Sequence, residues 1–308
     1  TWPFQVAFTL DVLLLALAIS AILKLKGRPA AGVTWSFGAP LFLLSLCGGF
    51  GVVFVAILAP WWIGLSWRGD RSRLALATAL PSLAVLMAGA GLVGSSRPAQ
   101  FPPSPGRGAT LQVSLEALAS CLGSPGAKHW PLSGGIAGGA VLLCFLFLLR
   151  GFRRHPDTRL ACGGMMGTLG GILVLALALG YSRAGLSPFF GFTERYVTLF
   201  CLLPFLLFVA ADLAGRPLLA RIVQIFLFAG ALLVYFPNAQ RAEDDLAPRR
   251  RAIESLLPDI RAKLPIPALA ARHSSYWCPG NPRMFEQGLL ELARSRMSIY
   301  RTLEPPAR

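Results

Sequence analysis

The sequence is dominated by apolar runs that are long enough to cross a lipid bilayer. Seven of them, separated by polar segments, lie at 5–23, 36–66, 74–94, 132–149, 160–181, 196–214 and 220–236. A helix that crosses the hydrocarbon layer needs about 20 apolar residues. Because 55% of the residues are hydrophobic and only 14% are charged, a soluble enzyme, a disordered chain and a disulfide-dense secreted module are excluded. We therefore predict an all-α, polytopic transmembrane helix bundle.

The formal net charge of +15 does not indicate nucleic-acid binding, because the basic residues lie in short connections between the apolar runs. Loops with an excess of Lys and Arg stay on the cytoplasmic side of a membrane. Four short connections are therefore predicted to be cytoplasmic. They contain Lys24, Lys26 and Arg28; Arg68, Arg71 and Arg73; Arg150, Arg153, Arg154 and Arg159; and Arg216 and Arg221.

The run 36–66 is too long for one crossing and short for two. One long helix ending at Pro60 would place the first two basic connections on opposite sides of the membrane. A hairpin of two short helices that turns within residues 47–51, where three glycines occur, places all four connections inside, and glycine suits a turn better than a helix interior. We expect the hairpin, and hence about eight crossings with both chain ends outside.

The sequence divides into a transmembrane domain at 1–236 and a more polar, extracytoplasmic tail at 237–308. Two amphipathic helices joined by a Pro-rich loop are expected in the tail. Either helix could lie on the membrane surface or pack under the external loops. The apolar positions of the first helix are Leu256, Leu257, Ile260 and Leu264, and those of the second are Phe285, Leu289, Leu292 and Met297.

Two arginines lie in the short loop at 182–195, which is predicted to be external. Arg183 and Arg195 are surrounded by aromatic residues, with Glu194 and Tyr196 on either side of the second. Arginine binds phosphate through two parallel hydrogen bonds, so this pair is predicted to bind the phosphate of a lipid-linked substrate. The alternative is that Arg195 and Tyr196 are interfacial anchors, with Arg195 paired to Glu194.

Asp11 is a carboxylate well inside an apolar run and away from its cytoplasmic edge. A buried acid in a membrane is a candidate functional residue, although Asp11 lies close enough to the outer end of its run for a structural role. Gly163, Gly167 and Gly171 recur every four residues, which is typical of close helix packing. Neither a metal site nor a cofactor is predicted, because no motif for one occurs.

Cys121 and Cys278 lie outside the apolar runs, in segments predicted to be external. A disulfide between them is permitted in an oxidising compartment and would hold the tail over the external loops. Pairing cannot be deduced from sequence, so two separate thiols remain the alternative.

Several short motifs resemble a family of large bacterial membrane proteins. They are the helix start Trp2-Pro-Phe-Gln5, the small-residue hairpin of Gly48–Gly51 with Ala59-Pro60-Trp61, the segment Ser114–Pro125 ending in Leu-Gly-x-Pro, the pattern Arg183-x-Gly185…Gly191…Arg195-Tyr196-x-Thr198, and the closing segment Leu289–Tyr300. Many of those proteins look like C-type (GT-C-fold) integral membrane glycosyltransferases, which use polyprenyl-phosphate sugars.

This resemblance implies a glycosyltransferase-like protein of the bacterial inner membrane that acts on polyprenyl-phosphate-linked sugars at the external face. Membrane lipid and a polyprenyl-linked sugar would be its partners. In C-type glycosyltransferases the catalytic acid lies in the first external loop, a region that would precede Thr1, so the chain is expected to lack its N-terminal catalytic part. The catalytic role is not assigned to Asp11 or Glu194, which do not match that motif.

Two other functions remain open. A non-catalytic transporter or scaffold would favour internal repeats and ionisable residues near the bilayer midplane, and Asp11 is the one candidate of that kind. A lipid-linked oligosaccharide polymerase or ligase would use the same external arginines, and the sequence does not separate it from a glycosyltransferase.

Overall fold

The computed structural model describes residues 2–25, 31–66, 79–85, 87, 104–186, 189–278, 281–295, 300 and 303. All regular structure in these segments is helical, and no strand occurs among them. The contacts within the chain define two compact units, Thr1–Pro237 and Asn238–Arg308.

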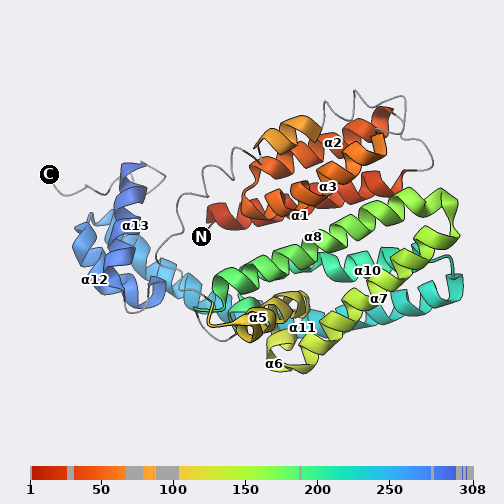
Figure 1. Cartoon of the computed structure of the whole chain (residues 1–308). Helices are drawn as coiled ribbons and strands as arrows, with labels where there is room; N and C mark the ends of the chain where they lie inside the picture. Colours follow the sequence, from red (N-terminus) through yellow and green to blue (C-terminus); the bar gives the residue numbers. More distant parts are fainter. Residues whose placement is uncertain are drawn as a thin grey trace. The chain divides into compact units, whose positions relative to one another are not determined.

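The first unit is a bundle of apolar helices (Figure 1). Its main helices are α1 (Trp2–Leu23), α2 (Ala31–Leu46), α3 (Gly49–Ser66), α5 (Arg107–Ala119), α6 (Ser124–Lys128), α7 (Leu132–Arg154), α8 (Arg159–Arg183), α9 (Glu194–Phe200), α10 (Leu202–Leu213) and the first part of α11 (Pro217–Arg261). Short 3₁₀ turns occur at Ser120–Leu122, Pro156–Thr158 and Phe190–Phe192.

Four helical segments of the described chain are long and apolar enough to cross a membrane. They are Leu132–Arg154, Pro156–Arg183, Tyr196–Leu213 and Pro217–Arg261, and shorter apolar helices lie at Phe8–Leu23, Val33–Leu46 and Phe50–Leu65. The all-helical fold class is therefore confirmed, and these four segments suggest a membrane protein. Eight crossings, the external position of both chain ends and the extracytoplasmic position of the tail remain predictions.

The predicted break in the run 36–66 is confirmed. Helix α2 ends at Leu46 and α3 begins at Gly49, and the two helices pack against each other. Gly48 has a φ of +103°, a backbone conformation that residues with a side chain rarely adopt. The turn is tighter than expected, because Gly49 and Gly51 already belong to the first turn of α3.

Helix α8 occupies the centre of the first unit and packs against α1, α3, α5, α7 and α10 (Figure 1). Its glycine stripe contacts α3, as the spacing predicted. Each glycine lies against a side chain of α3, with Trp61 against Gly163, Leu58 against Gly167 and Phe54 against Gly171. The absence of side chains on this stripe lets the two backbones approach closely, which is how helices associate in lipid.

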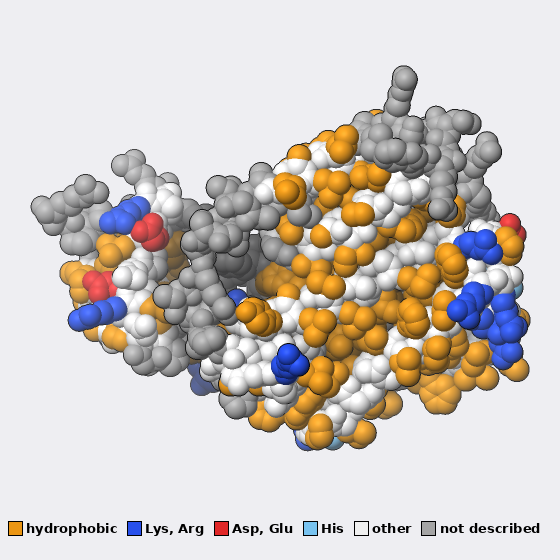
Figure 2. Space-filling view, viewed as in Figure 1, with side chains coloured by type: hydrophobic (Ala, Val, Ile, Leu, Met, Phe, Trp, Pro, Cys, Tyr) orange, Lys and Arg blue, Asp and Glu red, His pale blue; other side chains and the backbone are white. Residues whose placement is uncertain are grey.

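Basic connections lie together at one end of the first unit. Arg150, near the end of α7, is close enough to Arg154 and Arg216 for their charges to repel one another. The backbone of Gly215 also lies against the imidazole of His155. The α7–α8 and α10–α11 connections are therefore neighbours. Figure 2 shows Lys and Arg side chains gathered where α7 and α8 join, and hydrophobic side chains over the flank of the helices.

Helix α8 also fixes the separation of its two ends. It contains 25 residues from Arg159 to Arg183, which is about 38 Å at 1.5 Å per residue. That length exceeds the ~30 Å hydrocarbon thickness. If α8 crosses the bilayer, Arg183 lies on the side of the membrane opposite the basic connections.

Two expectations for the last third of the chain are wrong. The last apolar helix does not stop at Pro237, since α11 continues to Arg261. Proline is tolerated inside membrane helices because neighbouring groups satisfy the backbone groups that it frees. The segment expected to be a Pro-rich loop contains a further helix, α12 (Ile266–Trp277), before α13 (Pro282–Arg294). Prolines stand in the first turns of α12 and α13, where their missing N–H is not needed.

The second unit has a small core of its own. The apolar faces of α12, α13 and the end of α11 pack against one another, so each predicted amphipathic face has a protein partner. The buried residues of this core are Leu256, Ile260, Ile266, Leu269, Leu289, Ala293 and Leu303.

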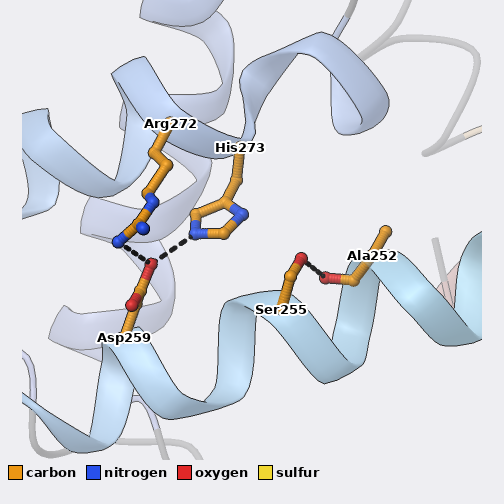
Figure 3. Close-up of polar contacts among 5 residues, drawn as sticks. All are labelled: Ala252, Ser255, Asp259, Arg272 and His273. Carbon is orange, nitrogen blue, oxygen red and sulfur yellow. Dashed lines mark hydrogen bonds and ion pairs between the residues drawn. The ribbon is translucent and has the colours of Figure 1, made fainter.

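A polar cluster joins α11 to α12 beside this core (Figure 3). Asp259 Oδ2 lies 2.8 Å from Nε2 of the buried His273 and accepts a hydrogen bond from Arg272 Nη1 at 3.0 Å. The hydrogen bond with His273, followed by the charge of Arg272, holds the pKa of the Asp259 carboxyl below its usual 3.8. The cluster is therefore a charged link between two helices.

Candidate functional site

Arg183 is the last residue of α8, at the end of the first unit opposite the basic connections. Its side chain is half-buried, and its guanidinium carbon lies 5.9 Å from the centre of the Phe190 ring. Phe190 opens the 3₁₀ turn that leads into α9. A cation over an aromatic face is held by the ring quadrupole, so this contact orients the guanidinium at the end of α8. We call this region the Arg183 end; it also includes α5, the turn Phe190–Phe192 and α9.

Glu116 is a residue of the Arg183 end that the sequence analysis missed. It lies in α5, and its side chain is fully buried. One carboxylate oxygen accepts a hydrogen bond from the Gly191 N–H at 3.2 Å, and the other accepts one from Gln112 Nε2 at 2.8 Å. Hydrogen bonds to a carboxylate are stronger than neutral ones. Glu116 therefore fixes the turn that connects Arg183 to α9.

Two glycines allow this arrangement because they let other backbone segments touch α5. An added Cβ at Gly191 would lie 2.6 Å from the Val113 carbonyl oxygen and would also overlap Glu116. Gly180, one turn before Arg183, similarly meets Ser114 and the backbone of Thr110. These contacts leave no room for a side chain at either position. They hold α5 against the end of α8, through Gly180, and against the Phe190–Phe192 turn, through Gly191.

The other predicted residues of this loop belong to α9. Glu194 and Arg195 form its first turn, and their side chains lie outside the described part of the structure. Tyr196 is buried, and its ring packs edge-on against Phe50 of α3 with 6.5 Å between the ring centres. Tyr196 therefore connects α9 with the α2–α3 hairpin, and the phosphate-binding role of Arg195 remains a prediction.

Asp11 lies in α1 beside the same hairpin. Its side chain is only 3% exposed, and neither carboxylate oxygen forms a hydrogen bond. A Cβ added at Gly51 would lie 3.0 Å from Asp11 Oδ1, which places the carboxylate against the first turn of α3. A buried carboxylate without a partner is costly. Within the described part of the chain, the negative charge of Asp11 is therefore left without a stabilising contact. A position near the outer end of the run, as the sequence suggested, would have allowed contact with water at the membrane surface.

The predicted residues and Glu116 form two neighbouring groups. Arg183 and Glu116 each contact the Phe190–Phe192 turn, whereas Asp11 and Tyr196 flank the α2–α3 hairpin. Helix α9 joins the groups because it packs against both α1 and α5. Among the described residues, the arrangement contains the guanidinium of Arg183, which can bind an anion, and the buried carboxylates of Asp11 and Glu116.

The two cysteines of the predicted disulfide belong to different units. Both are half-buried free thiols. Burial raises the pKa of the Cys121 thiol to about 12, so this thiol is a poor nucleophile at neutral pH. Because Cys121 lies in the first unit and Cys278 in the second, their pairing remains a prediction.

Among the described residues, no three His, Cys, Asp or Glu side chains are grouped so that they could hold a metal ion. Comparison with known proteins adds no assignment: no family model, no curated protein and no solved structure matches the chain.

Proposed function

We propose that the chain is part of an integral membrane glycosyltransferase-like protein, and that its Arg183 end receives a polyprenyl-phosphate-linked sugar at the external membrane face. In this proposal Arg183 and Arg195 hold the phosphate, which leaves when the sugar is transferred. Positive charge close to the leaving phosphate stabilises the charge that develops on it during the reaction.

The observation that carries the proposal is the position of Arg183. It stands at the opposite end of α8 from Arg159 and hence away from the basic connections that the charge rule assigns to the cytoplasm. Arginine is disfavoured on the external side of a membrane. Binding of an anionic ligand at that surface would explain why Arg183 stands there. The half-buried guanidinium over Phe190 is oriented before any ligand arrives, which lowers the entropy cost of binding.

The chain offers a closely matched control for this arginine. Arg159 opens the same helix, and its guanidinium carbon lies 5.6 Å from the Phe152 ring, so it repeats the cation–aromatic contact at the opposite end. A general effect of charge or of stacking would change ligand binding when either arginine is substituted. A phosphate site at the Arg183 end would change it only when Arg183 is substituted.

The test uses the purified full chain in lipid nanodiscs, with binding of a short radiolabelled polyprenyl phosphate as the measurement. We expect Arg183→Gln to weaken binding about tenfold, the loss of roughly one charge-assisted contact, and Arg159→Gln to leave it unchanged. The parent polyprenol, which lacks the phosphate, should bind weakly to all three proteins. Equal binding of the alcohol and the phosphate, or equal losses in both variants, would contradict the proposal.

Glycosyl transfer requires a separate measurement. The nanodisc-embedded chain is incubated with a polyprenyl phosphate carrying a radiolabelled hexose, and release or transfer of the sugar is followed. Turnover that is unaffected by Arg183→Gln would contradict the assigned role of this arginine.

A further inference from the structure

Asp11 and the break between α2 and α3 form a second site, which the proposed function does not use. Three features meet there. The carboxylate of Asp11 is buried and forms no hydrogen bond. The last turn of α2, with Leu44, lies beside it, and so does the first turn of α3, with Gly51.

Two kinds of oxygen face the bare α-carbon of Gly51. A Cβ at this position would overlap the Leu44 carbonyl oxygen and would lie 3.0 Å from Asp11 Oδ1. The carboxylate and the carbonyl are therefore close neighbours. Leu44 lies in the last turn of α2, and its carbonyl accepts a hydrogen bond from the Cys47 N–H at 3.2 Å, which leaves one of its two lone pairs available.

The charges at this place favour a cation. No cationic side chain among the described residues pairs with Asp11. The carbonyl end of α2 adds the negative pole of a helix. The titratable side chain that the described structure places near Asp11 is the Cys47 thiol at the break, and a thiol supplies no positive charge. A carboxylate in this setting requires neutralisation from outside the chain.

Broken helices in membrane proteins commonly serve this purpose, because carbonyls at the end of a half-helix coordinate monovalent cations. Divalent ions are less suitable here. Calcium takes six to eight oxygen ligands, and magnesium demands a near-ideal octahedron, whereas this site shows a single carboxylate and the Leu44 carbonyl. One negative charge is neutralised by one monovalent ion.

We propose that Asp11 and the Leu44 carbonyl, at the break between α2 and α3, bind a monovalent cation such as sodium. The ion joins α1 to the hairpin and replaces the hydrogen bonds that Asp11 lacks. This inference is independent of the lipid-phosphate site, because its test requires neither a lipid-linked sugar nor Arg183.

The test measures thermal unfolding of the purified full chain in sodium, potassium, calcium and a large organic cation at equal ionic strength and constant pH. An ion that binds only the folded state raises its stability, and we expect sodium or potassium to raise the Tm by about 2–4 °C over the organic cation. Asp11→Asn should abolish this increment. Asp157→Asn, which neutralises an exposed carboxylate in the α7–α8 connection, should retain it.

A second measurement covers the case in which Asp11→Asn does not fold. Binding of ²²Na⁺ to the unaltered chain should saturate at about one ion per molecule and be displaced by unlabelled sodium. A Tm that is the same in all four salts, stabilisation by calcium alone, or a sodium increment that persists in Asp11→Asn would overturn the proposal.

Discussion

The Glu116 carboxylate accepts a hydrogen bond from the backbone N–H of Gly191, a residue 75 positions further along the chain. This bond joins α5 to the turn between Arg183 and α9. Since Glu116 is fully buried, water cannot replace it as the acceptor. The geometry of the Arg183 end therefore depends on the buried carboxylate of Glu116 in α5.

Glu116→Ala should destabilise the first unit. The substitution leaves the Gly191 N–H without its acceptor, and an unsatisfied buried donor costs about 1–3 kcal/mol. Glu291→Ala is the control, because Glu291 forms only an exposed pair with Arg294, and such pairs contribute about 0–1 kcal/mol. Thermal unfolding in detergent measures both. Equal Tm values for the two variants would show that the Glu116–Gly191 bond contributes little.

Gly191→Ala should disturb the same contact from the other side. The new methyl group would overlap Glu116 and the Val113 carbonyl, and overpacking of this kind costs about 1–3 kcal/mol. Gly135→Ala in α7 provides the comparison, since an added Cβ there meets nothing within 4 Å and alanine favours a helix. We expect a lower Tm for the first variant and an unchanged or higher one for the second. The opposite order would contradict the packing described here.

The Asp259 cluster should make the second unit sensitive to acid. The pKa of Asp259 is lowered in the folded state by His273 and Arg272, so this carboxylate stabilises the fold above its unfolded pKa of about 4. That stabilisation is lost as the pH falls from about 5 through the lowered pKa. Hydrogen exchange of the peptide 266–277 in the full chain, corrected for the intrinsic rate at each pH, measures the loss.

Asp259→Asn removes the carboxylate and supplies the control. In this variant the corrected exchange of the same peptide should be faster at neutral pH and nearly constant down to pH 3. A variant whose acid response matches that of the unaltered chain would assign the response to other groups.

The topology is tested by two cysteines introduced on either side of α7. Lys128 and Asp157 are both exposed, and α7 separates them. In intact cells, and with the native cysteines replaced, Lys128→Cys should react with a membrane-impermeant maleimide, whereas Asp157→Cys should react only after the membrane is opened. The reverse pattern would place the basic connections outside.

The helices of the first unit were largely predictable because apolar runs in lipid have few alternatives to helical structure. The turn at Gly48 was predictable from two independent signals, the glycines and the charge of the flanking connections. Helix α12 was missed because its prolines resemble those of a loop, although proline is well tolerated in a first turn. The continuation of α11 beyond Pro237 was missed for the related reason that proline usually ends a helix.

The candidate site was predictable only in part. Arg183 was identified because basic residues are disfavoured on one side of a membrane. Glu116 was not, because a glutamate within a leucine-rich helix resembles a residue on the solvated face. Its burial is decided by Gly191, which is distant in sequence. The bare positions at Gly180 and Gly191, on either side of Arg183, were the signal that could have indicated a close backbone approach there.

The break at Gly48 also has a consequence for the surrounding lipid. Helices α2 and α3 contain 16 and 18 residues, so they reach about 24 and 27 Å, which is less than a hydrocarbon layer of about 30 Å. If α2 and α3 each cross the membrane, the bilayer meets this hydrophobic mismatch by thinning locally. Lipid headgroups beside the hairpin would then lie deeper than elsewhere, and the phosphate of a neighbouring lipid would reach the protein below the ordinary level of the membrane surface.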